Sequence, residues 1–262
     1  MGKTVLLSQY CWEQRTRSRR SVAWLSLSEN EERPERFLGA LSLSLRRACP
    51  EVGERLQMLL LSAADIPSDL AMMLLCNELS QYDKPISLVL DNCETIQSDL
   101  IWRLIKMLLD NSGACLQLLC ASRQYIPLVD SRNLLEGKQL VLNTGSLRYT
   151  PSEAKEYMLQ NFIWEPSESV MHACYKHSVG WPLLLTAVKQ QFKTPIEFTA
   201  ENFDDLMEPY FRDRCQQYSE QDMEIILCGS ILNTPSISIV SQILEISESE
   251  VEMVFEREFP VV

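Results

Sequence analysis

Short groups of polar residues could do chemistry in this chain, and the first is Gly2-Lys3-Thr4. It matches the last positions of the phosphate-loop pattern G-x-x-x-x-G-K-[ST]. In such a loop, backbone amides hold phosphate groups, the lysine reaches the β and γ phosphates, and the hydroxyl binds Mg²⁺. The apolar residues at 5–7 suit the start of a helix. Because so short a match also arises by chance, both interpretations stay open at this point.

The second candidate is Asp91, which ends the apolar run 86–91. An acid at the carboxyl end of a strand is the Walker B arrangement, in which the carboxylate holds the Mg²⁺ shell. Ligands of open parallel sheets bind at those strand ends. The alternative is a strand that ends in a turn-forming Asp-Asn pair. Because Lys3 stands at the start of an earlier helix, we favour Asp91 as a catalytic and Mg²⁺-binding residue.

The third candidate is Arg123, which follows the apolar run 116–121 and Ser122. At the end of the next parallel strand, an arginine would lie on the same sheet edge as Asp91. It could then contact a γ phosphate through two parallel hydrogen bonds. The alternative is an exposed loop arginine, and only the position along the series of strands argues for the site.

Alternating apolar segments must position these residues. The sequence predicts strands at 22–27, 86–91, 116–121 and 139–142, and helices starting at Lys3 or Thr4, at Pro34, and over 69–80 and 98–110. Strands that alternate with helices indicate a parallel sheet covered on both faces. The fold class is therefore α/β.

The pattern changes after residue 147, where strong strands stop. Thr150-Pro-Ser-Glu153 is a helix capping box with proline at the first helical position, and similar boxes start at Ser219 and Ser247. The sequence therefore predicts a helical bundle and then a second small helical domain behind the α/β core.

Composition limits the classes of partner. The net charge is −12, so we expect no direct binding of DNA or RNA by this part of the protein. No apolar run approaches the roughly 20 residues of a membrane helix, and the N-terminus lacks the layout of a signal peptide. The nine cysteines form no CxxC pair, which favours reduced thiols in a cytoplasmic protein.

Five segments in this order resemble the ATPase domain of the large ATP-binding LuxR-type (MalT-like) transcriptional regulators, which are P-loop ATPases of the STAND class. The segments are Gly2-Lys-Thr-Val-Leu-Leu-Ser-Gln, Val22-Ala-Trp-Leu-Ser-Leu, Ser87-Leu-Val-Leu-Asp-Asn with Ala121-Ser-Arg, Leu147-Arg-Tyr-Thr-Pro-Ser-Glu-Ala, and Ser178-Val-Gly-Trp-Pro. The resemblance covers nearly the whole chain. It implies a P-loop NTPase core over 1–146, an all-helical lid over 147–198 and a partial winged-helix domain over 199–262.

The resemblance also implies a function, an ATP/ADP switch that controls oligomerisation and activation. Gly2 and Lys3 would contact phosphates, Thr4 and Asp91 would hold Mg²⁺, Arg123 would sense the γ phosphate, and Pro182 would lie near the adenine. The full-length protein would self-associate and bind DNA through a C-terminal helix-turn-helix outside this chain. As an enzyme it would be at most a slow ATPase.

Two departures from the family pattern bear on this expectation. The strand before the phosphate loop and the first glycine of the loop are missing, so we expect a chain truncated at both ends and poorly soluble. Asn92 stands where the family has a second acid, and a neutral amide cannot act as a general base. Glu94 is expected to point elsewhere. We therefore expect nucleotide binding with slow or absent hydrolysis.

Two other functions compete with the switch. A degenerate P-loop scaffold would serve as a protein-interaction module without binding nucleotide, and Asn92 and the incomplete loop favour it. An AAA+ motor would need an acid after Asp91, and Asn92 argues against it.

Overall fold

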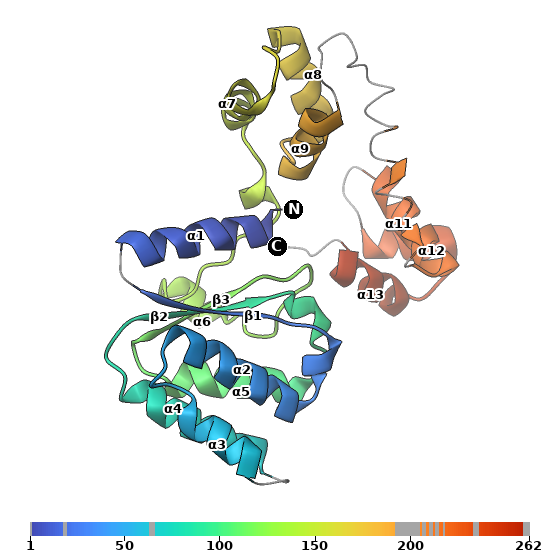
Figure 1. Cartoon of the computed structure of the whole chain (residues 1–262). Coiled ribbons are helices and arrows are strands. Elements are labelled where there is room, and N and C mark those ends of the chain that lie inside the picture. The colour runs from blue at the N-terminus through green and yellow to red at the C-terminus, as the bar shows by residue number, and fades with distance from the viewer. Residues whose placement is uncertain are drawn as a thin grey trace. The chain divides into compact units, whose positions relative to one another are not determined.

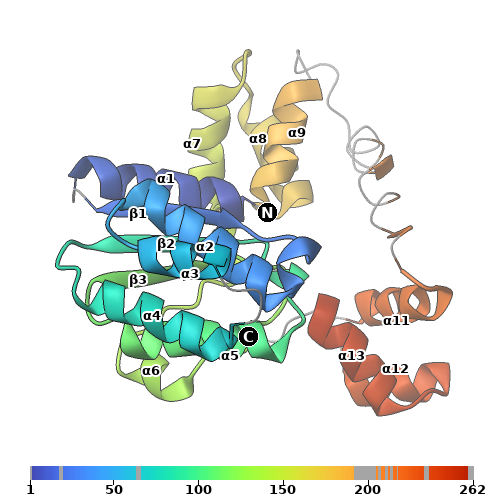
Figure 2. The same ribbon diagram turned by 60° about the horizontal axis from the view of Figure 1, so that its bottom comes forward.

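A computed structural model describes residues 2–17, 20–62, 66–191, 205, 208–209, 212, 215–216, 218–232 and 236–258. The chain divides into two compact units, Lys3–Gln139 and Leu140–Val262 with Met1–Gly2. The first unit is an α/β layer structure, and the second is helical (Figures 1 and 2).

A parallel sheet forms the centre of the first unit. Among the described residues it has three strands, β1 (Ser21–Ser26), β2 (Ile86–Asp91) and β3 (Leu116–Cys120), in the order β1-β2-β3. Every residue of β2 is buried, because β2 lies between its neighbours, whereas β3 is half-buried throughout. These strands confirm the predicted strands at 22–27, 86–91 and 116–121 to within one residue at each end.

The larger apolar core lies between the sheet and one layer of helices. That layer contains α2 (Pro34–Ala48), α3 (Glu54–Ser62), α4 (Ser68–Ser80) and α5 (Asp99–Asn111) (Figure 1). Phe37, Leu41 and Leu45 of α2 are fully buried, as their helical spacing predicts. Burial of such side chains contributes about 1.5–3 kcal/mol each, so this layer fixes the sheet that carries the candidate site.

Helix α1 (Lys3–Arg17) covers the other face of the sheet (Figure 1). Its Cys11 packs with Val22 of β1 and Val89 of β2, and Leu7 and Tyr10 adjoin this cluster. Helices on both faces of a parallel sheet confirm the predicted α/β class. The packing also places the first turn of α1 at the carboxyl end of β2, where Thr4 bonds to Asp91.

The predicted strand at 139–142 was wrong. The backbone there is irregular, and the Leu140 side chain is 80% exposed. A strand needs a neighbour for its backbone groups, and none of the described residues pairs with this segment. The Gln139 side chain instead donates to Leu128 O and accepts from Asp130 N, while α6 (Ser131–Leu135) precedes it. Neither α6 nor α3 was predicted.

The second unit contains α7 (Pro151–Asn161), α8 (Glu168–Ser178) and α9 (Pro182–Gln191), which share a core around Met158, Cys174 and Leu185. The Thr150–Glu153 capping box is present, with both reciprocal bonds formed. Tyr149 N–H donates to Gly180 O at 2.8 Å, and a Cβ added to Gly180 would lie 2.1 Å from Tyr149 O. Glycine at 180 is therefore required by both this close approach and its φ of +71°.

The same unit also contains α11 (Glu220–Ile231), α12 (Ile237–Leu244) and α13 (Glu248–Glu258), with Ile225, Val240 and Phe255 in a separate small core. The predicted helix starts are confirmed, because Ser219 accepts from Asp222 N and Ser247 forms a capping box with Glu250. The predicted boundary at 198/199 lies outside the described residues. Within the part of the chain that the structure describes, no helix is long and apolar enough to cross a membrane.

Candidate functional site

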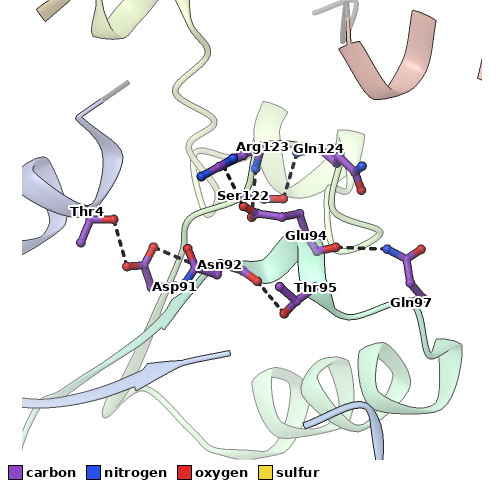
Figure 3. Close-up of polar contacts among 9 residues, drawn as sticks. All are labelled: Thr4, Asp91, Asn92, Glu94, Thr95, Gln97, Ser122, Arg123 and Gln124. Carbon is purple, nitrogen blue, oxygen red and sulfur yellow. Dashed lines mark hydrogen bonds and ion pairs between the residues drawn. The ribbon is translucent and has the colours of Figure 1, made fainter. Parts of the chain in front are cut away.

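Asp91 is the last residue of the central strand and is only 5% exposed. Its backbone oxygen accepts a hydrogen bond from Leu27 N–H at 2.8 Å, which continues the ladder beyond β1. Its carboxylate accepts from Asn92 N–H at 3.1 Å through Oδ1 and from the Thr4 hydroxyl at 3.0 Å through Oδ2. Both oxygens are therefore held in a fixed orientation at the carboxyl end of the sheet (Figure 3).

Thr4 reaches Asp91 from the first turn of α1, across 87 positions in the sequence. Lys3 is the first residue of that helix, and Gly2, with a φ of +72°, directly precedes it. The positive end of a helix dipole favours anions at this terminus, and the first turn of α1 contains no acidic residue. The structure thus brings Thr4, the last residue of the Gly-Lys-Thr tripeptide, to the same strand end as Asp91.

Asn92 adopts the left-handed conformation, with φ 60° and ψ 43°. This conformation costs most residues roughly 1–2 kcal/mol, but asparagine tolerates it better. It turns the chain sharply after Asp91 into the short helix η2 (Cys93–Thr95), where Thr95 N–H and the Thr95 hydroxyl both donate to Asn92 O. The side chain of Asn92 is exposed, so the residue after Asp91 acts chiefly as a backbone turn.

The ends of β2 and β3 are joined by backbone bonds from Ala121 N to Leu90 O and from Cys93 N to Ala121 O, both 2.9 Å. Arg123 follows β3 on this edge, as predicted. Its guanidinium Nε lies 3.2 Å from one oxygen of Glu94, and its backbone N–H donates to the other at 3.1 Å (Figure 3). The structure therefore pairs Arg123 with Glu94.

Glu94 was not among the predicted site residues, and its side chain was expected to point elsewhere than toward the site. The carboxylate is directed toward Arg123 in Figure 3, and the side chain is only 18% exposed. A spacing of three residues from Asp91 across a turn was the available signal, but no recognised motif requires an acid there.

Pro182 belongs to the other unit, where it begins α9 and its carbonyl accepts the Thr186 hydroxyl at 2.9 Å.

The Thr4 hydroxyl and Asp91 carboxylate form an all-oxygen donor set, which suits Mg²⁺. This ion is commonly held by one or two carboxylates while water and phosphate oxygens complete its octahedron. The residues present therefore fit a Mg²⁺-phosphate group at the start of α1.

Comparison with known proteins finds distant relatives of the kind that the sequence resembles. The chain matches no protein-family profile. It is 28% identical over 158 residues to the HTH-type transcriptional regulator MalT of Serratia proteamaculans (strain 568), a match that covers 60% of this chain and 17% of that protein. The MalT of Yersinia enterocolitica gives the same identity and coverage over 163 residues.

A second kind of relative is the serine/threonine-protein kinase PknK of Mycobacterium tuberculosis, 27% identical over 153 residues, or 58% of this chain and 14% of that protein. The chain thus spans less than a fifth of the length of these relatives. Over somewhat more than half of its own length, the chain is distantly homologous to MalT and to PknK.

Proposed function

We propose that this chain is the ATP/ADP-binding switch module of a cytoplasmic MalT-like transcriptional regulator, with Mg²⁺ as the accompanying ion. The observation that carries the proposal is the 3.0 Å hydrogen bond between the Thr4 hydroxyl and the Asp91 carboxylate. It joins the last residue of the Gly-Lys-Thr tripeptide to the acid at the end of the central strand.

This contact supports nucleotide binding because two weak sequence signals meet at one place. A chance tripeptide or a chance strand-end acid would have no reason to adjoin the other. A bound Mg²⁺ would supply positive charge that offsets the charge of the phosphates. Lys3 would contact the phosphates, and Thr4 and Asp91 would hold the ion and its water shell.

The remaining residues have supporting roles in the proposal. Arg123, at the end of the neighbouring strand, would sense the γ phosphate, and Pro182 in the lid would lie near the adenine. Exchange of ADP for ATP would then control self-association of the full-length regulator. DNA would be bound by a helix-turn-helix outside this chain, because the chain itself carries a net charge of −12.

We further propose that hydrolysis is slow. The residue after Asp91 is an exposed asparagine in a left-handed turn, so it supplies no general base. Glu94, the nearest following acid, has both carboxylate oxygens engaged by Arg123. A site that binds without rapid turnover suits a switch better than a motor.

Titration calorimetry with Mg-ATP and Mg-ADP tests the proposal. It should be run on this chain and on a version extended at its N-terminus to the whole G-x-x-x-x-G-K-[ST] pattern, because the loop amides supply much of the phosphate contact. We expect binding by the extended version that Lys3→Ala abolishes. If neither version binds either nucleotide, the chain is a scaffold without a nucleotide site.

A further inference from the structure

The contact between Glu94 and Arg123 has an unusual form for a surface ion pair. One carboxylate oxygen of Glu94 lies 3.2 Å from Nε of Arg123, and the other accepts the backbone N–H of the same residue at 3.1 Å. Both oxygens of one acid are therefore used by one arginine, and they fix both its backbone and the base of its guanidinium.

The two partners differ in exposure and in how they are held. Glu94 is 18% exposed and lies in η2, between the tight turn at Asn92 and the bond from Gln97 Nε2 to Glu94 O at 3.1 Å. The Arg123 side chain is 59% exposed. When this pair opens, the arginine is therefore the partner that moves, while the carboxylate stays close to its present position.

Carboxylate and phosphate compete for the same donors of a guanidinium, because both offer paired acceptor oxygens to its fork. With Nε committed to Glu94, the Nε edge of the guanidinium is closed to a phosphate. Only a group at the γ position would gain from opening the pair, because the loop amides meet the α and β phosphates in the proposed site.

We infer that Glu94 is a positioning residue that holds Arg123 away from the nucleotide and so lowers the preference for ATP over ADP. This inference rests on the proposed function. A γ phosphate that takes the Nε edge of Arg123 breaks the Glu94–Arg123 pair, and ADP binding leaves the pair intact. Only the triphosphate therefore opens the pair. Opening the pair links the length of the phosphate chain to the position of the loop that follows β3.

The test compares Mg-ATP with Mg-ADP affinity in the wild type, Glu94→Gln, Arg123→Ala and the double variant, by calorimetry on the chain and on its extended version. Glutamine keeps the shape of the acid but removes its charge. We expect Glu94→Gln to tighten ATP binding by about two- to fivefold, which lies within the range for exposed ion pairs, with ADP affinity unchanged. In the Arg123→Ala background, Glu94→Gln should have no further effect.

Asp69→Asn is the matched control, because it breaks another ion pair of the same unit, 3.5 Å from Arg103, that has no part in the site. It should leave both affinities unchanged. Equal changes in ATP and ADP affinity for Glu94→Gln, or no change in either, would overturn the inference while leaving the nucleotide site in place. If no version binds either nucleotide, the proposed function fails and this inference fails with it.

Discussion

The carboxyl ends of β2 and β3 hold their charged residues in opposite ways. Asp91 ends a strand that is flanked by a strand on each side, and it is 5% exposed. One of its carboxylate oxygens accepts the Thr4 hydroxyl at the start of α1, and the other accepts the backbone N–H of Asn92. Arg123 follows a strand paired on one edge among the described residues, and its side chain is 59% exposed. One end is fixed by the core, and the other is held by a single acid.

This difference suits two different tasks. A cation site loses affinity when its ligands must reorganise, so its acid is best placed on a rigid, buried strand. A sensor must exchange one partner for another, so its arginine is best placed where the exchange costs little. The α/β unit provides both environments on adjacent strands, which are joined by backbone bonds at Ala121.

The largest expected effect comes from removing the fixed end. Asp91→Ala should weaken Mg-nucleotide binding by about 10- to 100-fold, the usual loss when a group that holds a metal shell is deleted. The measurement is nucleotide titration with and without Mg²⁺, and the variant should lose the dependence on the ion. Asp110→Ala, at the exposed end of α5, is the control. Equal Mg²⁺ dependence in wild type and Asp91→Ala would show that Asp91 does not hold the ion.

Thr4→Val should give the next largest loss. It removes the hydroxyl that donates to Asp91 while keeping the branched shape, and we expect about tenfold weaker Mg-nucleotide binding. Thr4→Ser should restore most of the affinity. Thr16→Val, near the other end of α1, removes a hydroxyl that donates only to Trp12 O and Glu13 O, and it should change nothing. A Thr16 effect as large as that of Thr4 would point to general damage to the helix.

The turn at Asn92 should affect stability more than binding. Asn92→Ala places an ordinary side chain at φ 60°, and we expect a loss of about 1–2 kcal/mol in the free energy of unfolding. Asn92→Gly should be nearly neutral, because glycine tolerates this conformation. Urea melts of the two variants make the measurement. If alanine proved as stable as glycine, the asparagine would not be retained for its backbone conformation.

The smallest expected effect concerns the thiol of Cys93, two residues after the end of β2. Its hydrogen bond with Cys120 is the main cause that raises the pKa of this thiol well above its usual value, and burial is the second cause. Because the thiolate is the reactive form, alkylation at pH 8 should be much slower at Cys93 than at the half-buried Cys228, and it should rise only as the pH is increased further. Peptide mass spectrometry after timed labelling checks this. Rapid labelling of Cys93 would mean that the end of β2 opens readily.

The sequence predicted the carboxyl end of β2 better than that of β3. Strands β1, β2 and β3 were predictable because each is a short apolar run between polar turns, and Asp91 follows from the strand that it ends. The failed strand at 139–142 has an equally apolar pattern. Periodicity shows that a segment can be a strand, but not that a neighbour is present to pair with it.

Glu94 shows the same limit at the site. Its role depends on a contact across 29 positions with Arg123, which no local pattern encodes. Helix starts were easier to predict, because all the residues of a capping box such as Thr150–Glu153 lie within four positions of the sequence. The assignment of Pro182 to an adenine contact rests on the family resemblance alone and stays a prediction.

The central claim, a Mg²⁺-nucleotide site at Thr4 and Asp91, is tested most directly by calorimetric titration of Mg-ATP and Mg-ADP into this chain and into its N-terminally extended version, each with and without Lys3→Ala. We predict that the extended version binds both nucleotides, that binding requires Mg²⁺, and that Lys3→Ala abolishes it. Absence of binding in the extended version, or binding that Lys3→Ala leaves intact, would contradict the claim.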